Sequence, residues 1–251
     1  MHPALLLDLD GTLYTDVGAV AGGTAAVARL RAENIPFRCL TNTTTRPRAG
    51  LLDRLLRYGY DVRLEEILTP ASAAVAYCQA RGLRRVLPFV PQAAEADLVG
   101  LELISEDTPD AVLLGDLGEQ WTFARLQQAF LAVTAGAEMV ALSRDRYFQR
   151  RGQLTLDAGP FVAALEYATG KAATLVGKPS AAFFQAALGS LGVSPEAAVM
   201  VGDDLWSDIQ GAQRVGIPAW LVRTGKFREE ALRTSGVVPA RVIDSVAVIA
   251  W

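Results

Sequence analysis

The stretch ALLLDLDGTLYTD, residues 4–16, decides the fold and raises the first question about function. Its four apolar residues, Ala4–Leu7, predict a buried strand that runs directly into two carboxylates, Asp8 and Asp10. Each carboxylate costs free energy to desolvate unless a cation meets it. The pattern therefore predicts a strand end built around a positively charged partner.

Outside this stretch, short apolar strands alternate with amphipathic helices, which predicts an α/β fold around a mostly parallel sheet. Strands are expected at 4–8 and 36–41. A second α/β series begins near residue 84, ends near residue 168, and is expected to form a small sheet of its own. We therefore predict a core domain of residues 1–81 and 172–251, with an inserted α/β domain of residues 82–171.

The composition limits the class of protein. The chain has 251 residues, of which 51% are hydrophobic and 20% are charged, as in soluble globular proteins. A net charge of -3 argues against a nucleic-acid partner. No apolar run reaches the roughly 20 residues of a membrane span, and no secretory signal is evident, so we expect a cytoplasmic protein without a membrane partner. His2 is the only histidine, which excludes chemistry based on an internal histidine.

Four polar sites follow directly after predicted strands. They are Asp8 with Asp10, Thr41 with Asn42, Lys178, and Asp203 with Asp208 in VMVGDDLWSDIQGA. The carboxyl ends of parallel strands meet at one edge of the sheet, where ligands bind. Carboxylate oxygens are suitable ligands for Mg²⁺, and a lysine with hydroxyl and amide groups supplies donors for phosphate oxygens. The sequence therefore predicts a metal and phosphate site at this edge.

Each of these motifs taken alone has an ordinary structural interpretation. An Asp-x-Asp pair is commonly a solvated turn, and Thr41-Asn42 is common chemistry at the end of a strand. In GDDLWSD, Asp204 is explained equally well as the N-cap of a helix. The occurrence of all four motifs in this order favours the functional interpretation over these alternatives.

The strings DLDGTL, LTNTT, GKP and GDDLWSD resemble, in order, the four motifs of the haloacid dehalogenase (HAD) superfamily of phosphatases. The long insert between the second and third motifs is similar to that of the capped NagD and nitrophenylphosphatase-like branch, class IIA. GPFVAALEYAT, residues 159–169, resembles the subgroup of phospholysine phosphohistidine inorganic pyrophosphate phosphatase-like proteins. The resemblance implies a Rossmann-like core with a parallel sheet and an inserted α/β cap domain.

The resemblance also implies catalytic roles for three residues. Asp8 corresponds to the nucleophile that forms an aspartyl-phosphate, and Asp10 to the general acid and base. Lys178 corresponds to the lysine that holds the nucleophile and the phosphate together. An aspartate needs such help because it repels a phosphate dianion.

The remaining motif residues are implied to bind phosphate or metal. The Thr41 hydroxyl and the backbone of Asn42 and Thr43 would cradle the phosphoryl group. Asp203 corresponds to a direct ligand of Mg²⁺, and Asp208 to a ligand that acts directly or through a water. Asp8 and the backbone carbonyl of Asp10 complete the implied metal site.

Substrate specificity is expected in the cap domain, because the motif residues recognise only the phosphoryl group and the metal. Within SRDRYFQRRGQLTLDAG, residues 143–159, the candidates that read the leaving group are Arg144, Tyr147 and Asp157. The alternative is a solvated surface or a contact between identical chains, and a homo-oligomer stays open.

Together these observations predict an Mg²⁺-dependent phosphatase of small phosphorylated compounds, which acts through an aspartyl-phosphate. Phosphomonoesters, pyrophosphate and phosphoramides all present a suitable phosphoryl group. A phosphomutase of the same superfamily and a non-catalytic metal- or phosphate-binding module are the alternatives. Asp10 argues against a dehalogenase, which does not need this second acid.

Overall fold

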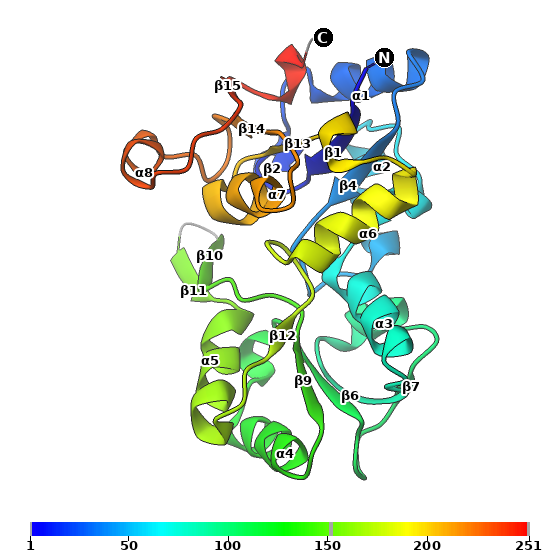
Figure 1. The fold of residues 1–251 in the computed structure, drawn as a ribbon, viewed down its shortest axis with the longest axis vertical. Helices are drawn as coiled ribbons and strands as arrows, with labels where there is room; N and C mark the ends of the chain where they lie inside the picture. The colour runs from blue at the N-terminus through cyan, green and yellow to red at the C-terminus, as the bar shows by residue number, and fades with distance from the viewer. Residues whose placement is uncertain (1, 151–152, 250–251) are drawn as a thin grey trace. The chain divides into compact units, whose positions relative to one another are not determined.

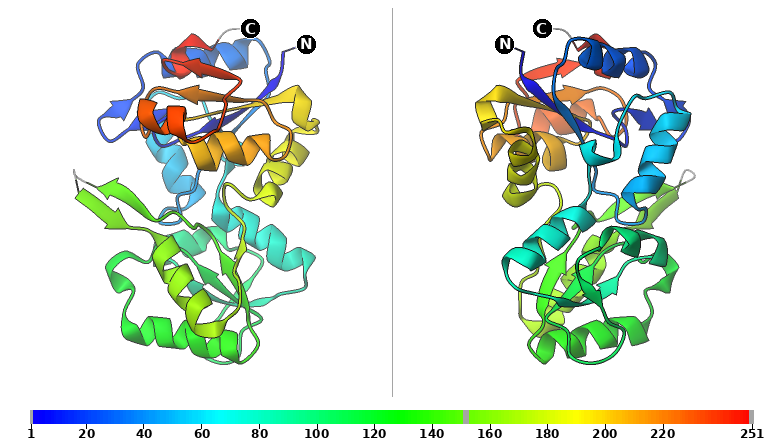
Figure 2. Two further views of the ribbon diagram at one scale, coloured as in Figure 1. Left: turned by 60° about the vertical axis from the view of Figure 1, so that its left-hand side comes forward. Right: turned by 90° about the vertical axis from the view of Figure 1, so that its right-hand side faces the viewer.

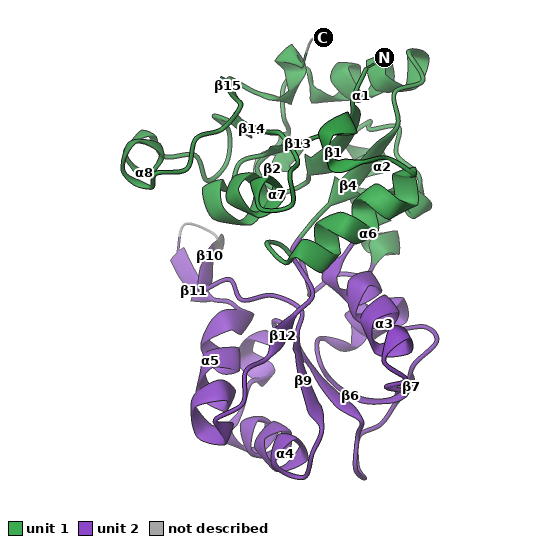
Figure 3. Ribbon diagram, in the orientation of Figure 1, with its two compact units in different colours: residues 1–41, 48–68, 178–251 green, residues 42–47, 69–177 purple. Residues whose placement is uncertain are grey.

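The computed structural model describes residues 2–150 and 153–249. Figure 1 traces the chain, and Figure 3 colours its two compact units. Unit 1 comprises Met1–Thr41, Arg48–Leu68 and Lys178–Trp251, and unit 2 comprises Asn42–Pro47 and Thr69–Gly177. Within the ranges that the structure describes, no helix has the length and apolar character needed to cross a membrane.

Unit 1 is built on a six-stranded parallel sheet in the order β15-β14-β13-β1-β4-β5. Its strands are β1 (Ala4–Asp8), β4 (Phe37–Leu40), β5 (Ile67–Leu68), β13 (Ala198–Gly202), β14 (Ala219–Val222) and β15 (Arg241–Ile243). β1 lies between β13 and β4, with Leu6 paired to Met200 on one side and to Arg38 on the other. A separate short hairpin joins β2 (Tyr14–Thr15) to β3 (Gly18–Ala19).

The helices of unit 1 cover both faces of this sheet, which explains why β1 is buried along its whole length. They are α1 (Gly23–Ala32), α2 (Arg48–Arg57), α6 (Ala181–Leu191), α7 (Gly211–Gln213) and α8 (Glu229–Thr234). Leu5 and Leu7 share an apolar core with residues of α1 and α2. Figure 2 shows α6 on the opposite side of the sheet from α2.

Unit 2 has its own five-stranded parallel sheet in the order β12-β9-β8-β6-β7. Its strands are β6 (Arg85–Phe89), β7 (Glu102–Leu103), β8 (Ala111–Leu114), β9 (Glu138–Ala141) and β12 (Thr174–Leu175). Its helices are α3 (Pro70–Ala80), α4 (Phe123–Thr134) and α5 (Ala158–Thr169). An antiparallel hairpin of β10 (Tyr147–Arg150) and β11 (Gln153–Leu156) occupies the charged stretch before α5.

The α/β fold with parallel sheets confirms the prediction from the sequence pattern. The observed units divide the chain elsewhere than the predicted junctions at 81/82 and 171/172. Helix α3 falls in unit 2 because its small buried face, including Ala74 and Cys78, packs in one core with Val86 and Leu113 of that sheet. The second junction lies between Gly177 and Lys178.

Candidate active site

Three strand ends of unit 1 place the predicted motif residues. Asp8 is the last residue of β1, Thr41 follows β4, and Asp203 follows β13. Because β1 is hydrogen-bonded to both β4 and β13 in parallel, these three ends lie at the same edge of the sheet. The prediction that Lys178 follows a strand of this sheet is wrong, because β12 belongs to the sheet of unit 2. Lys178 instead lies two residues before Ser180, which N-caps α6 by accepting a hydrogen bond from the backbone of Phe183.

A buried cluster of three carboxylates lies at this edge. Asp8, Asp203 and Asp208 each place a carboxylate oxygen within 4.8 Å of the others. The Lys178 ammonium donates to Asp8 Oδ1 at 2.5 Å and to Asp208 Oδ1 at 2.6 Å, although Asp8 is 170 positions away in the sequence. Lys178 is only 2% exposed, so both hydrogen bonds are shielded from solvent. The structure thus brings together four residues that the motifs singled out.

The cluster has more negative than positive charge. Burial raises the pKa of Asp8, and burial together with the neighbouring carboxylates raises the pKa of Asp203 to about 8 and that of Asp208 to about 7. Burial alone would lower the pKa of Lys178, but Asp208 and Asp8 raise it, so the lysine stays charged. One ammonium cannot neutralise three ionised carboxylates, so the donor set suits an additional divalent cation.

Two glycines enclose the Asp203 carboxylate. Gly11 has a φ of +91° and Gly225 a φ of +65°, and a Cβ at either position would overlap the Asp203 side chain. The loop of Gly225 is tied to the site by Thr224, whose hydroxyl donates to the Gly11 carbonyl at 2.5 Å. The backbone N–H of Lys226 donates to Asp203 Oδ2 at 2.6 Å.

This loop, residues 224–226, was missed by sequence reasoning. It follows β14, so the rule that drew attention to the other strand ends applies to it equally. Its sequence, Thr-Gly-Lys, carries no pair of acidic residues, and its contribution comes largely from backbone groups. A search for metal-binding side chains therefore passes over it.

Asp204 and Asp208 support the helical segment Leu205–Gln210. Asp204 is its N-cap and accepts from the backbone N–H groups of Trp206 and Ser207 at 3.0 and 2.9 Å. Burial opposes its ionisation, yet Lys226 and these backbone donors lower the pKa of Asp204. Asp208 Oδ2 accepts from the Asp204 N–H at 3.0 Å, while its Oδ1 accepts from Lys178. Both oxygens of Asp208 therefore have protein partners.

Asp10 lies beside the cluster and is exposed, unlike the three buried carboxylates. Its Oδ2 accepts a hydrogen bond from the Tyr14 hydroxyl at 3.2 Å. Desolvation by the surrounding chain raises the pKa of Asp10, the charge of Arg54 opposes the rise, and solvent screens both effects at this exposed side chain. Asp8 Oδ2 has its own donor, the Thr12 hydroxyl, at 3.2 Å.

The second motif spans the junction of the two units. Thr41 is buried in unit 1 at 1% exposure, and its N–H donates to the carbonyl of Leu68 beside the sheet. Asn42 and Thr43 belong to unit 2, where the Asn42 side-chain amide donates to Asp145 Oδ2 at 3.4 Å.

The predicted specificity residues of unit 2 have different surroundings. Asp157 N-caps α5 and accepts from the N–H of Ala158 at 2.6 Å, which accounts for an acidic residue there without a substrate. Arg144 donates to Glu166 at 2.5 Å. Tyr147 is 56% exposed on the hairpin, so its ring is accessible.

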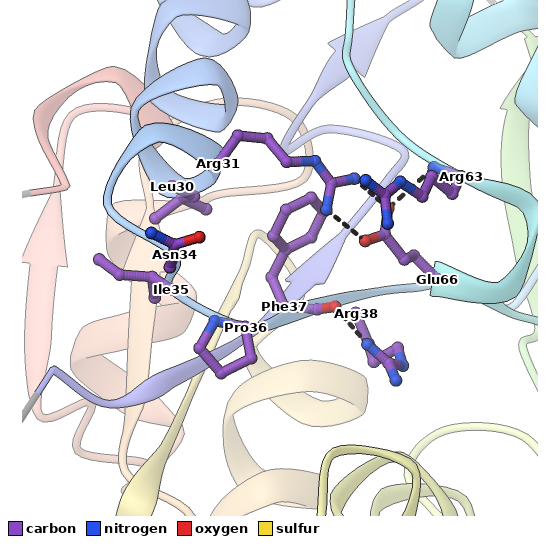
Figure 4. Close-up of a pocket in the computed structure, with 9 residues that line it drawn as sticks. All are labelled: Leu30, Arg31, Asn34, Ile35, Pro36, Phe37, Arg38, Arg63 and Glu66. Carbon is purple, nitrogen blue, oxygen red and sulfur yellow. Dashed lines mark hydrogen bonds and ion pairs between the residues drawn. The ribbon is translucent and has the colours of Figure 1, made fainter.

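A cavity of about 370 Å³ lies in unit 1, and its lining does not include Asp8, Asp203 or Asp208 (Figure 4). It borders Phe37, the first residue of β4, whereas Thr41 follows the other end of that strand. Arg31 lines the cavity. Its guanidinium donates to Glu66 Oε1 at 2.6 Å and lies 4.7 Å from the centroid of the Phe37 ring. The Arg31 and Glu66 side chains in this wall are thus paired with each other, and we assign the cavity no role.

Family models and curated relatives agree with these motifs. A haloacid dehalogenase-like hydrolase model matches residues 5–103, and a HAD-hydrolase-like model matches residues 175–249. The human haloacid dehalogenase-like hydrolase domain-containing protein 2 is 41% identical over 225 residues, which cover 90% of this chain and 85% of the relative. Human phospholysine phosphohistidine inorganic pyrophosphate phosphatase is 39% identical over 231 residues, 89% of this chain and 84% of the relative.

Solved structures share the fold over nearly the whole chain. NagD from E. coli K-12 has a TM-score of 0.90 at 25% identity and covers 99% of this chain and 98% of its own. The p-nitrophenyl phosphatase from Archaeoglobus fulgidus has a TM-score of 0.92 at 25% identity, covering 98% of each. A glycerol phosphate phosphatase from Mycobacterium tuberculosis, in complex with magnesium, has a TM-score of 0.87 at 29% identity and covers 98% of this chain and 75% of its own. The chain therefore belongs to the haloacid dehalogenase-like hydrolases, in the class IIA branch of NagD and the nitrophenylphosphatases, and is a phosphatase.

Proposed function

We propose that this phosphatase hydrolyses small phosphorylated compounds with Mg²⁺ as its cofactor and through an aspartyl-phosphate on Asp8. The observation that carries the proposal is the buried cluster in which Lys178 bridges Asp8 and Asp208 beside Asp203. Phosphomonoesters are the primary substrate class. Pyrophosphate and phosphoramides are included because a relative at 39% identity is named for phospholysine, phosphohistidine and inorganic pyrophosphate.

Asp8 supplies the attacking oxygen in the first step. Its carboxylate bonds to phosphorus while the bond from phosphorus to the leaving-group oxygen breaks, and the electron pair stays on that oxygen. The Lys178 ammonium, 2.5 Å from Asp8 Oδ1, reduces the repulsion between the carboxylate and the incoming dianion. The Thr12 hydroxyl on Asp8 Oδ2 helps to fix the carboxylate plane.

Asp10 handles the protons of both steps. In its acid form it gives a proton to the leaving-group oxygen, which departs as the neutral alcohol. It then accepts a proton from the water that attacks the aspartyl-phosphate, and inorganic phosphate and free Asp8 result. The exposed position of Asp10 at the rim of a buried cluster suits a group that exchanges protons with substrate and water.

The residues present fit a magnesium site. Asp8, Asp203 and the backbone carbonyl of Asp10 would hold the ion, and Asp208, whose oxygens face Lys178 and a backbone amide, would act through a water. When bound, Mg²⁺ would neutralise negative charge on the phosphoryl oxygens. The excess of buried carboxylates supports this proposal, as does the magnesium complex of the glycerol phosphate phosphatase.

Phosphate binding is assigned to the second and third motifs. We propose that the Thr41 hydroxyl, the backbone of Asn42 and Thr43, and the Lys178 ammonium hold the phosphoryl oxygens. Unit 1 is then the catalytic core, and unit 2 is the cap that reads the leaving group. Substitutions of Arg144 or Tyr147 should change the ranking among natural substrates more than the rate with p-nitrophenyl phosphate.

The test is turnover of p-nitrophenyl phosphate by the purified chain with Mg²⁺, with EDTA, and in the variant Asp8→Asn. Acid quenching during turnover should trap a phosphorylated protein whose label hydroxylamine releases, as expected of an acyl phosphate. Release of inorganic phosphate separates hydrolysis from the phosphomutase alternative, which would return an isomeric phosphate ester. A wild-type chain that binds Mg²⁺ and phosphate but turns over no phosphomonoester would establish the binding-module alternative instead.

A further inference from the structure

The chain after Asp10 folds back on itself and brings a tyrosine to that carboxylate. The N–H of Gly11 donates to the carbonyl of Tyr14 at 2.7 Å, and the N–H of Tyr14 reaches the carbonyl of Leu9 at 3.3 Å. This tight loop places the Tyr14 side chain beside Asp10, four positions earlier, and its hydroxyl donates to Asp10 Oδ2 at 3.2 Å. One oxygen of Asp10 is thereby occupied by a donor from the protein.

The Tyr14 ring is packed in the hydrophobic core of unit 1. It is 1% exposed, lies 5.8 Å from the ring centroid of Tyr58, and is covered by the Arg54 guanidinium, 4.3 Å from its own centroid. Arg54 belongs to α2, and Tyr58 follows that helix directly. The position of the Tyr14 ring is therefore set by packing within unit 1. A buried ring with a polar tip at an exposed carboxylate is well suited to orient that carboxylate.

We propose that Tyr14 is the positioning residue of Asp10 in the transfer of its proton to the leaving group, an inference that rests on the proposed function. The hydroxyl donates to Oδ2, which fixes the plane of the carboxyl group and leaves Oδ1 to give the proton. When the bond between phosphorus and the leaving-group oxygen breaks, that oxygen takes the Oδ1 proton. Without the hydroxyl the carboxyl group can rotate and carry its proton on either oxygen.

The experiment uses substrates of similar shape that differ in their need for a proton. Nitrophenolate leaves as a stable anion, whereas phenolate depends more on protonation, so phenyl, 4-chlorophenyl and 4-nitrophenyl phosphate form a graded series. For Tyr14→Phe we expect kcat/KM to fall about 5- to 30-fold with phenyl phosphate and less than about threefold with 4-nitrophenyl phosphate. Because kcat/KM reports the phosphorylation step, slow hydrolysis of the aspartyl-phosphate does not hide this difference.

Tyr60→Phe is the matched control. Tyr60 is buried to the same 1% exposure, and its hydroxyl donates to the carbonyl of Leu13 in the same loop rather than to Asp10. Its loss should affect the three substrates equally. In an Asp10→Asn background, Tyr14→Phe should have no further selective effect, because the proton that it positions is gone.

An equal loss on all three substrates in Tyr14→Phe would overturn the proposal, because it would mean that the hydroxyl only supports the fold. Unchanged kinetics with every substrate would overturn it equally. Failure of the proposed function is a separate result: the wild-type chain would then turn over none of the series, or Asp8→Asn would remain active.

Discussion

Replacing Lys178 with methionine tests the central claim about the cluster, that one buried ammonium holds two carboxylates in place. Methionine preserves most of the length and apolar volume of the lysine stem, so the change is mainly electrostatic. It removes hydrogen bonds of 2.5 and 2.6 Å to Asp8 and Asp208, all three side chains being buried. Removing one partner of a buried ion pair costs about 3–5 kcal/mol of folding stability, and we expect a loss in this range for the metal-free protein.

The pH dependence of this loss follows from the carboxylates. Without the ammonium, the pKa values of Asp8 and Asp208 rise further in the folded state and stay ordinary in the unfolded state. The folded variant then binds more protons than the wild type, so its deficit grows as the pH rises. Urea unfolding in EDTA should therefore show a larger loss of stability at about pH 8 than at about pH 6.

Lys226→Met is the matched control at the same edge of the sheet. Its ammonium pairs with Asp204 at 3.1 Å, but the side chain is 53% exposed, so its loss should cost no more than about 1 kcal/mol. Turnover should fall by at least about a hundredfold in Lys178→Met, because the lysine also stabilises the transferring group. A Lys178→Met protein within about 1 kcal/mol of wild type at both pH values would refute the reasoning.

Three further outcomes are expected. Asp8→Asn should keep the fold but lower kcat with p-nitrophenyl phosphate by at least roughly a thousandfold, and substantial residual turnover would contradict its role as nucleophile. Asp203→Ala should raise the Mg²⁺ concentration needed for half-maximal rate, while Ca²⁺ should inhibit the wild type; equal rates with Mg²⁺, Ca²⁺ and EDTA would exclude a metal role. Because the folded pKa values of Asp203 (about 8) and Asp208 (about 7) exceed the ordinary 3.8, urea unfolding of the metal-free protein should show stability falling from about pH 4 to about pH 8, and Mg²⁺ should flatten this fall.

The sequence was informative wherever a side chain at a strand end carried the signal. Asp8 and Asp203 are far apart in the chain, but the geometry of a parallel sheet brings the ends of their strands together, so their meeting could be predicted. Lys178 follows β12, which belongs to the sheet of unit 2, and Asp208 lies within a helical segment, so this rule does not account for their positions. The α/β fold could be predicted from the alternation of strands and helices, and the family from the resemblance of four short motifs, and both are confirmed. The individual roles of these residues remain predictions.

Other features depend on contacts that a linear pattern does not encode. The contribution of residues 224–226 comes from a backbone amide and from the absence of a Cβ, neither of which has a distinctive residue type. The hydrogen bond from Tyr14 to Asp10 requires the specific turn between them. The alanines of α3 are compatible with either core, and only the packing of this helix with Val86 and Leu113 places it in unit 2.

The two glycines against Asp203 limit how this site can evolve. A single methyl group at Gly11 or Gly225 would collide with the Asp203 carboxylate, so a single substitution by a larger residue is disfavoured at both positions. Loops that follow β1, β13 and β14 are thereby locked to one another, and a useful change in one would require compensating changes in the others. Substitutions that arise in descendants of this sequence should therefore be rare in these loops and more frequent elsewhere in the chain. Changes outside the loops can alter substrate preference without disturbing the carboxylate cluster.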